Sequence, residues 1–221
     1  MRTSLRPFAP LALGVAVLAA GCARPRTAPA PARALNAAET AIYRLVAESV
    51  YVSTTGRSVG IVEAPLDTAC IARPCLPLAM RWGLDPLWWA AGDTAAAIDE
   101  RRDLLARVGE RMTLAGVAQG QPLLQSVLPD SAAAVAAHPD TASWTAFKEA
   151  HGGASGFVWF SPIGFDSGRD RALVYVDWQC GPRCGHTVTV ALHATPGGWR
   201  IADMLLVSSR ERRPGLAPPT P

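Results

Sequence analysis

The chain has 221 residues, 49% of them hydrophobic, and its 21 Lys and Arg against 18 Asp and Glu give a formal net charge of +3. Five of the basic residues precede residue 34, where there is no acid, so the remainder carries 16 bases against 18 acids. A nucleic-acid-binding domain carries a basic footprint, so nucleic acid is not expected as a partner. The remainder is long enough for one domain with a core of its own.

Residues 1–21 have the form of a secretory signal peptide. Arg2 and Arg6 precede an apolar stretch over 8–20 that is too short to cross a bilayer, and small residues follow it. The run Leu18-Ala19-Ala20-Gly21-Cys22 resembles the lipobox of bacterial lipoproteins. The resemblance implies that Cys22 is the lipid attachment site and that the membrane is a partner through this anchor. The alternative is an ordinary signal peptide followed by an unmodified cysteine.

Residues 22–33 alternate Ala, Pro and Arg, a composition typical of an extended, semi-rigid spacer. Ala23 is not aspartate, and the resemblance to lipoproteins then implies the outer membrane, facing the periplasm. We expect a single domain over 34–208 and a disordered tail over 209–221.

The cysteines after Cys22 are even in number, which in an exported chain indicates disulfides. They are Cys70, Cys75, Cys180 and Cys184. We predict the local pairs Cys70–Cys75 and Cys180–Cys184, with crossed pairing as the open alternative. A zinc site is the other alternative, but the spacings differ from the usual two-residue gap between thiolate ligands. No metal and no cofactor is expected.

The first two thirds of the domain read mainly as helices and loops. A capping box formed by Asn36 and Glu39 predicts a helix through about residue 52. A strand is expected over 58–63, a loop over 64–92 and an irregular segment over 120–130. Further helices are predicted over 95–108, 131–137 and from 140 or 141, the last with Trp144 and Phe147 inward. The loop's Trp82, Trp88 and Trp89 are read as core, or alternatively as an exposed binding patch.

The last third reads as β-structure, which with the preceding helices predicts an α+β fold: N-terminal helices packed on a C-terminal antiparallel β-meander. The strands are expected over 157–161, 172–179, 186–194 and 199–207. A three-residue loop at 196–198 sets Val190 opposite Met204. The apolar face then holds Val174, Val176, Trp178, Val188, Val190, Leu192, Met204 and Leu206. The opposite face holds Tyr175, Asp177, Thr187, Thr189, His193 and Asp203, among Ile201 and Leu205.

Several short runs in this part carry a resemblance. They are Trp159-Phe160-Ser161-Pro162-Ile163-Gly164-Phe165, Ala172-Leu173-Val174-Tyr175-Val176, Cys180-Gly181, Cys184-Gly185 and Gly198-Trp199-Arg200-Ile201. Together they resemble the C-terminal segment of a group of secreted bacterial proteins of unknown function, which implies the sheet and no activity. The helix-on-sheet pattern is also similar to the cone-shaped domains of the nuclear-transport-factor-2 type, which implies a place for a small ligand.

The candidate catalytic residues are His193, Asp203, Asp177 and Tyr175 on the polar sheet face. His193 is expected diagonally from Asp203, and a histidine oriented by a carboxylate is a general base. The alternative is the polar side of a half-buried sheet, where alternation alone requires such residues. The run Cys180-Gly181-Pro182-Arg183-Cys184 is one residue too long for a redox motif and has no helix after it. We therefore expect a binding or structural interaction module with an unidentified protein or small-molecule partner; the alternative is a small-molecule hydrolase or isomerase.

Overall fold

The computed structural model describes residues 32–66, 94–107 and 109–209. The expected signal peptide, Cys22, Cys70, Cys75, the tryptophans of the 64–92 loop and residues 210–221 lie outside these ranges. In the described ranges, no helix has both the length and the apolar character needed to span a membrane.

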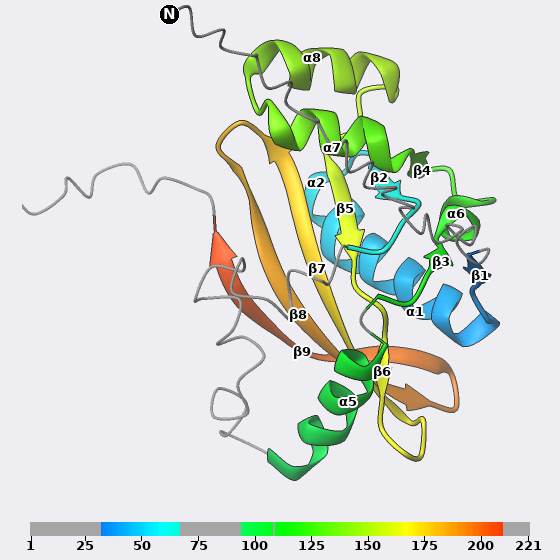
Figure 1. The fold of residues 1–221 in the computed structure, drawn as a ribbon. Coiled ribbons are helices and arrows are strands. Elements are labelled where there is room, and N and C mark those ends of the chain that lie inside the picture. Colours follow the sequence, from blue (N-terminus) through cyan, green and yellow to red (C-terminus); the bar gives the residue numbers. More distant parts are fainter. Residues whose placement is uncertain (1–31, 67–93, 108, 210–221) are drawn as a thin grey trace, which may run out of the picture. The chain divides into compact units, whose positions relative to one another are not determined.

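A seven-stranded mixed sheet forms the framework (Figure 1). Its strands follow the order β4 (Leu124–Val127), β2 (Val59–Val62), β5 (Phe157–Phe160), β7 (Arg171–Gly181), β8 (Cys184–Thr195) and β9 (Gly198–Ser209). A short strand, β6 (Gly164–Phe165), also pairs with β7. The pairs β4–β2 and β2–β5 are parallel, whereas β5–β7, β7–β8 and β8–β9 are antiparallel. The α+β fold with a C-terminal antiparallel meander is confirmed, and the parallel half was not predicted.

The expected first helix exists and has three parts. They are α1 (Ala37–Val46), the π-helix η1 (Ala47–Val52) and α2 (Ser53–Thr55). The predicted capping box is confirmed, because Glu39 N donates to Asn36 Oδ1 and Asn36 N donates to Glu39 Oε2. The helix ends at Gly56, whose φ of 63° lies in the left-handed region that glycine tolerates.

Two hydrophobic cores lie on opposite faces of the sheet. The larger packs the buried face of α1 and η1, with residues Ile42, Tyr43, Val46, Ala47 and Tyr51, against β2, β5, β7 and β8. The smaller lies on the other face of the parallel half, under α7 (Pro129–Ala137) and α8 (Thr141–Ala150). There Trp144 stacks on Phe157 with ring centroids 5.4 Å apart. Trp144 and Phe147 thus point inward as predicted.

Smaller elements connect the two halves. α5 (Thr94–Ala106) packs against β6, α6 (Ala115–Ala118) packs against α1, and β1 (Arg33–Ala34) pairs in parallel with β3 (Met112–Thr113). A Cβ added to Gly164 would overlap the Glu100 carbonyl and Leu104 of α5, so glycine is required for this close packing. Arg33 was expected in the spacer, but it forms part of β1 and so belongs to the folded domain.

One secondary-structure prediction was wrong. Residues 120–130 were expected to be irregular, yet they contain β4, which pairs in parallel with β2. β4 is a short edge strand in which only Leu124 and Val127 are buried, one in each core. Two apolar residues facing opposite sides give no alternating pattern, so the strand had no period-2 signal.

The predicted register of the meander is confirmed over its central part. Trp178 lies opposite His186, and Val190 lies opposite Met204. The predicted three-residue loop between β8 and β9 was wrong, because Thr195 pairs with Gly198 and leaves only two loop residues. A β-bulge in β9 between the partners of Ala191 and Leu192 restores the register, and it turns Ile201 toward the larger core rather than the polar face.

Two residues assigned to the apolar face are not buried. Met204 is 48% exposed and Leu206 is 59% exposed, because both lie on β9, the last strand of the sheet. At the turn between β7 and β8, Cys180 and Cys184 form the predicted disulfide, with their Cα atoms 5.1 Å apart. The pairing of Cys70 with Cys75 remains a prediction.

Candidate functional site

The four predicted catalytic residues fall into two separate places. Tyr175 and Asp177 are both buried on β7, facing away from α1. The Asp177 carboxylate accepts hydrogen bonds from Gln179 Nε2 at 2.9 Å and from the Thr187 hydroxyl at 3.2 Å. These residues form a buried polar cluster on the sheet.

His193 and Asp203 lie nearer the other end of the meander. His193 is half-buried and pairs across the strands with Arg200, whereas Asp203 is exposed and accepts from the Met204 amide at 2.8 Å. In the described part of the chain, no bond joins His193 to Asp203. His193 is four positions along the ladder from Thr189, the partner of Tyr175, or about 13 Å. The structure places Tyr175 and Asp177 on the same face of β7, and His193 lies apart from them.

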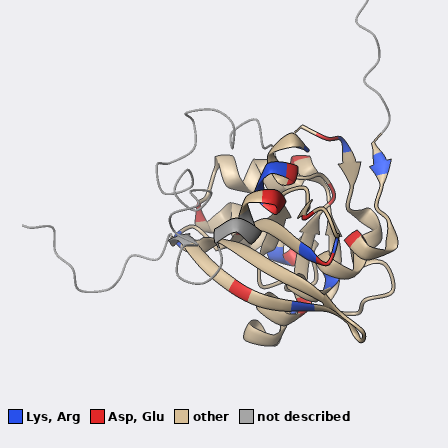
Figure 2. Ribbon diagram, turned by 90° about the horizontal axis from the view of Figure 1, so that it is seen from below, with Lys and Arg blue, Asp and Glu red and all other residues tan. Residues whose placement is uncertain are grey.

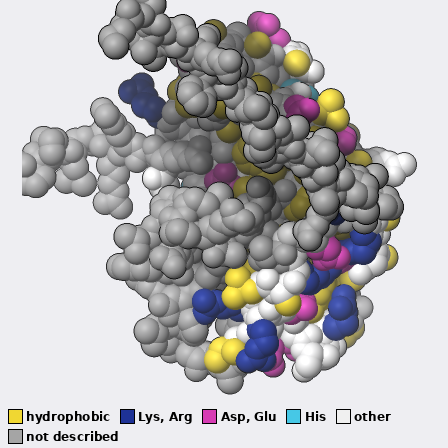
Figure 3. Space-filling view, viewed as in Figure 1, with side chains coloured by type: hydrophobic (Ala, Val, Ile, Leu, Met, Phe, Trp, Pro, Cys, Tyr) yellow, Lys and Arg dark blue, Asp and Glu magenta, His cyan; other side chains and the backbone are white. Residues whose placement is uncertain are grey.

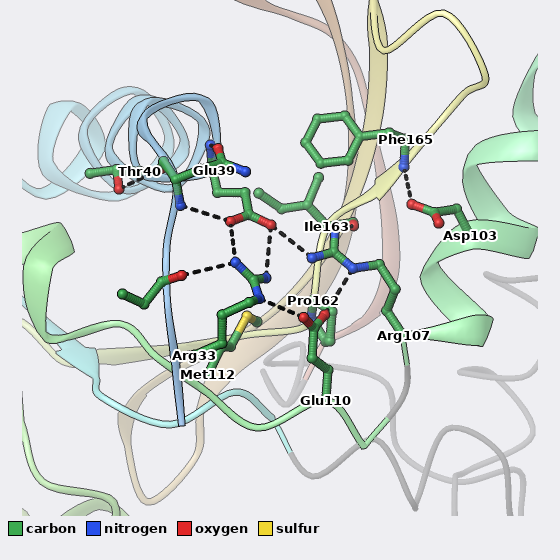
Figure 4. A network of polar contacts seen from close by, with 12 residues as sticks. Arg33, Glu39, Thr40, Asp103, Arg107, Glu110, Met112, Pro162, Ile163 and Phe165 are labelled. Carbon is green, nitrogen blue, oxygen red and sulfur yellow. Dashed lines mark hydrogen bonds and ion pairs between the residues drawn. The ribbon is translucent and has the colours of Figure 1, made fainter. Parts of the chain in front are cut away.

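The densest polar arrangement among the described residues is a cluster of four charged side chains, which we call the Glu39 cluster: Arg33, Glu39, Arg107 and Glu110 (Figure 4). The Glu39 carboxylate is 2% exposed and accepts from Arg33 Nη1 at 2.8 Å and from Arg107 Nη2 at 2.7 Å. Glu110 accepts from Arg33 Nε at 2.6 Å and from Arg107 Nε at 2.9 Å. Each arginine thus bridges both carboxylates.

The protonation of the Glu39 cluster follows from these bonds. Burial raises the pKa of Glu39, but hydrogen bonds from Arg33, Arg107 and the Asn36 amide outweigh it and lower the pKa to about 2. Burial also raises the pKa of Glu110, and its bonds to the same arginines lower it below its usual range. The hydrogen bond to Glu39 is the main cause of the raised pKa of Arg33. All four groups are therefore charged at neutral pH, and they balance.

Backbone contacts tie the Glu39 cluster to the turn that follows β5. Arg107 Nη1 donates to the Ile163 carbonyl at 2.6 Å (Figure 4). Nearby, the Tyr43 hydroxyl donates to the Ser161 carbonyl at 2.8 Å, and the Ser161 hydroxyl accepts from the Tyr175 amide at 2.9 Å. Together, these hydrogen bonds and the ion pairs of the Glu39 cluster join α1 to β7 and to the residues after α5. The Glu39 cluster therefore holds these parts of the domain together.

An open pocket of about 420 Å³ lies beside the Glu39 cluster. Its lining residues are Ala32, Glu63, Ala64, Pro65, Leu66, Gly109, Glu110, Arg111, Met112, Thr113 and Pro129. Glu63–Leu66 directly follow β2, and Pro129 lies just after β4. The pocket is therefore at the carboxyl ends of two neighbouring parallel strands; we call it the strand-end pocket.

The topology explains why a hollow exists there. The segment that leads back into β4 includes Met112, Leu114 and α6, and it packs in the larger core. The segment that leaves β4 begins α7, which packs in the smaller core on the opposite face. Where the connections of adjacent parallel strands diverge to opposite faces, a crevice opens outside their carboxyl ends, and ligands of open sheets bind in such crevices.

The strand-end pocket has walls of mixed chemistry. Its walls combine apolar side chains with two carboxylates, from Glu63 and Glu110, and its volume lies within the usual range for small-molecule sites. Among the lining residues that the structure describes, none is His, Cys or Ser.

A second open pocket, of about 620 Å³, lies where α5 meets β6. Its charged groups are engaged within the domain. Asp99 pairs with Arg102 at 2.8 Å, Asp103 accepts from the Phe165 amide at 2.8 Å, and Arg169 lies over the Phe165 ring. It offers a ligand fewer uncommitted groups than the strand-end pocket.

Charges on the described surface are mixed. Acidic and basic residues alternate along the elements in Figure 2, and the space-filling view in Figure 3 shows both signs side by side at its lower right. The described residues also contain no group of three or more His, Cys, Asp or Glu suited to a metal ion. Compared with protein-family models, curated proteins and solved structures, the chain shows no significant match.

Sequence reasoning missed the residues that matter most in this region. Glu39 was recognised as a helix cap, but its partners Arg33 and Arg107 are 6 and 68 residues away in the chain. Glu63 was placed at the end of a strand without a role. The one available signal was the position of Glu63 directly after a buried apolar strand, which becomes informative only once a parallel neighbour is known.

Proposed function

We propose that this chain is an exported lipoprotein of the bacterial cell envelope, anchored through Cys22, whose domain binds a small molecule in the strand-end pocket. The anchor rests on the signal-type residues 1–21 and on the small residues before Cys22. By the same reasoning from Ala23, the membrane is the outer one and the domain faces the periplasm.

The strand-end pocket is the observation that carries the binding role. It combines a volume of about 420 Å³ with a position at the carboxyl ends of β2 and β4, and its walls are mostly apolar. The Glu39 cluster supports this wall rigidly, since Glu110 belongs both to the cluster and to the lining. A preformed, supported pocket binds its ligand with a small ordering cost.

Native mass spectrometry of the gently purified intact chain tests the proposal. We expect a bound small molecule in the wild type and its loss in Ala64→Trp, where the added indole would fill the pocket. Ala142→Trp, on an exposed position of α8, is the matched control and should keep the ligand. Equal occupancy in Ala64→Trp and the wild type would move the binding site elsewhere.

A second candidate function, a small-molecule hydrolase or isomerase, is favoured by the buried polar cluster at Tyr175 and Asp177. The Asp177 carboxylate there is buried and accepts two hydrogen bonds. The general base first expected, His193, lies about four residues away along the strands. If a substrate is found, loss of turnover in His193→Ala would place the catalytic site at His193, whereas turnover within a factor of a few of the wild type would exclude His193 and leave the cluster at Tyr175 and Asp177 as the candidate.

A further inference from the structure

Glu63 is held in a fixed position at the edge of the strand-end pocket. Its amide donates to the Val127 carbonyl at 3.0 Å, and its carbonyl accepts from the Leu114 amide at 2.7 Å. The backbone of Glu63 is thus fastened to β4 on one side and to the start of α6 on the other. Its side chain leaves a rigid support, as a recognition group should.

The two carboxylates of the strand-end pocket differ in what already binds them. Each oxygen of Glu110 accepts from an arginine, so its charge is balanced. Glu63 accepts from the Ser126 hydroxyl through Oε1, and within the described part of the chain no basic side chain pairs with it. Arg111, the one basic residue among the described lining residues, is itself engaged in an interaction. Glu63 therefore brings to the pocket a carboxylate that has no basic partner among the described residues.

Apolar surface surrounds this charge. Pro65 and Leu66 follow Glu63 in the chain, and Met112 and Pro129 complete the wall. The Leu66 amide donates to the Phe160 carbonyl at 2.8 Å, which holds this segment against β5. A carboxylate within an apolar wall is complementary to a cation that carries a hydrocarbon part, and it repels anions.

We propose that the strand-end pocket takes a small organic ammonium ion, with its charged nitrogen on the Glu63 carboxylate and its hydrocarbon part against Pro65, Leu66, Met112 and Pro129. The assignment rests on the proposed function, because it gives a ligand class to the same pocket. The hydrocarbon part supplies affinity through burial, and the ion pair selects the sign of the charge.

Three six-carbon probes separate these contributions: n-hexylammonium, 1-hexanol and hexanoate. Their binding to the intact chain is measured by ligand-observed NMR, with protein-free samples of the same detergent as the reference. We expect n-hexylammonium to bind most tightly and hexanoate least tightly. Glu63→Gln should weaken n-hexylammonium by about fivefold or more and leave 1-hexanol unchanged. Glu149→Gln, on the exposed surface of α8, is the matched control and should change neither.

The outcomes distinguish the ligand class from the pocket itself. If 1-hexanol binds as tightly as n-hexylammonium and Ala64→Trp abolishes both, the pocket is a binding site and the ammonium assignment is wrong. If Glu63→Gln leaves n-hexylammonium binding unchanged, the assignment is also wrong. If Ala64→Trp has no effect on the binding of any probe, both the proposed function and the ammonium assignment are wrong. Unchanged far-ultraviolet circular dichroism of each variant checks that it has folded.

Discussion

Glu39 and Arg107 lie 68 residues apart in the chain, yet Arg107 Nη2 is 2.7 Å from Glu39 Oε1. The same carboxylate caps the helix that contains it, through the Asn36 amide at 3.0 Å. One buried side chain thus links a local signal for the start of a helix to a long-range contact. Loss of its charge should therefore lower the stability of the whole domain.

Glu39→Gln should lower the free energy of unfolding by about 3 kcal/mol at pH 7. The difference between the ordinary pKa of 4.5 and the value of about 2 in the folded chain corresponds to that amount. Urea unfolding of the intact chain measures it. Glu48→Gln, an exposed acid in η1, is the matched control and should stay within about 0.5 kcal/mol of the wild type.

The lowered pKa of Glu39 also predicts that the stability of the domain depends on pH. Because the pKa of Glu39 is lowered in the folded state, its contribution is complete above the unfolded value of 4.5 and is lost as the pH falls toward 2. The wild type should therefore lose stability over this range, and Glu39→Gln should lose less. Parallel pH profiles of the two proteins would contradict the role assigned to the carboxylate.

Gly164→Ala should destabilise the domain by about 2 kcal/mol or more, because its Cβ would overlap the Glu100 carbonyl of α5. The backbone of α5 cannot retreat without losing its contacts with β6. Gly116→Ala is the control, since a Cβ there meets no atom within 4 Å. Thermal unfolding of both variants measures the change in stability. An unchanged stability in Gly164→Ala would show that α5 packs less tightly than described.

Non-reducing peptide mapping should find Cys180 joined to Cys184 and Cys70 joined to Cys75. The first pair closes the β7–β8 hairpin, so reduction should chiefly loosen that turn, at a cost of about 2 kcal/mol for so small a loop. Cleavage after Arg73 and Arg183 leaves each local pair as two joined peptides. Peptides that join Cys70 or Cys75 to Cys180 or Cys184 would overturn both local pairs.

Cys22→Ser should release the chain from the membrane fraction and abolish its labelling by fatty-acid analogues, because the thiol is the proposed attachment point. Fractionation of cells that express each form measures both effects. Cys75→Ser is a useful control, since it removes a thiol outside the signal region and should leave labelling intact. Continued labelling of Cys22→Ser would refute the lipoprotein proposal.

The elements with strong local signals could be predicted from the sequence. The capping box at Asn36 and the alternation in the meander led to the correct helix start and to the correct central register. β4 was missed because an edge strand with one buried residue per face has no period. The bulge near Ala191 was missed because alternation cannot show an inserted residue, and it displaced Ile201 from its expected face.

The candidate site was harder to predict than the fold. A polar sheet face is visible in sequence, so Tyr175 and Asp177 could be grouped correctly. The strand-end pocket depends on β2 and β4 being parallel neighbours, a non-local fact that no short pattern contains. The partners of Glu39 likewise come from β1 and from the end of α5.

The β1–β3 pairing has a mechanical consequence if Cys22 is the anchor. Any pull from the membrane enters the domain at Arg33, and it reaches Glu39 and Glu110 through two salt bridges before it reaches the sheet. Ala32, the residue before Arg33, lines the strand-end pocket. Tension in the tether would therefore act on the wall of the pocket first.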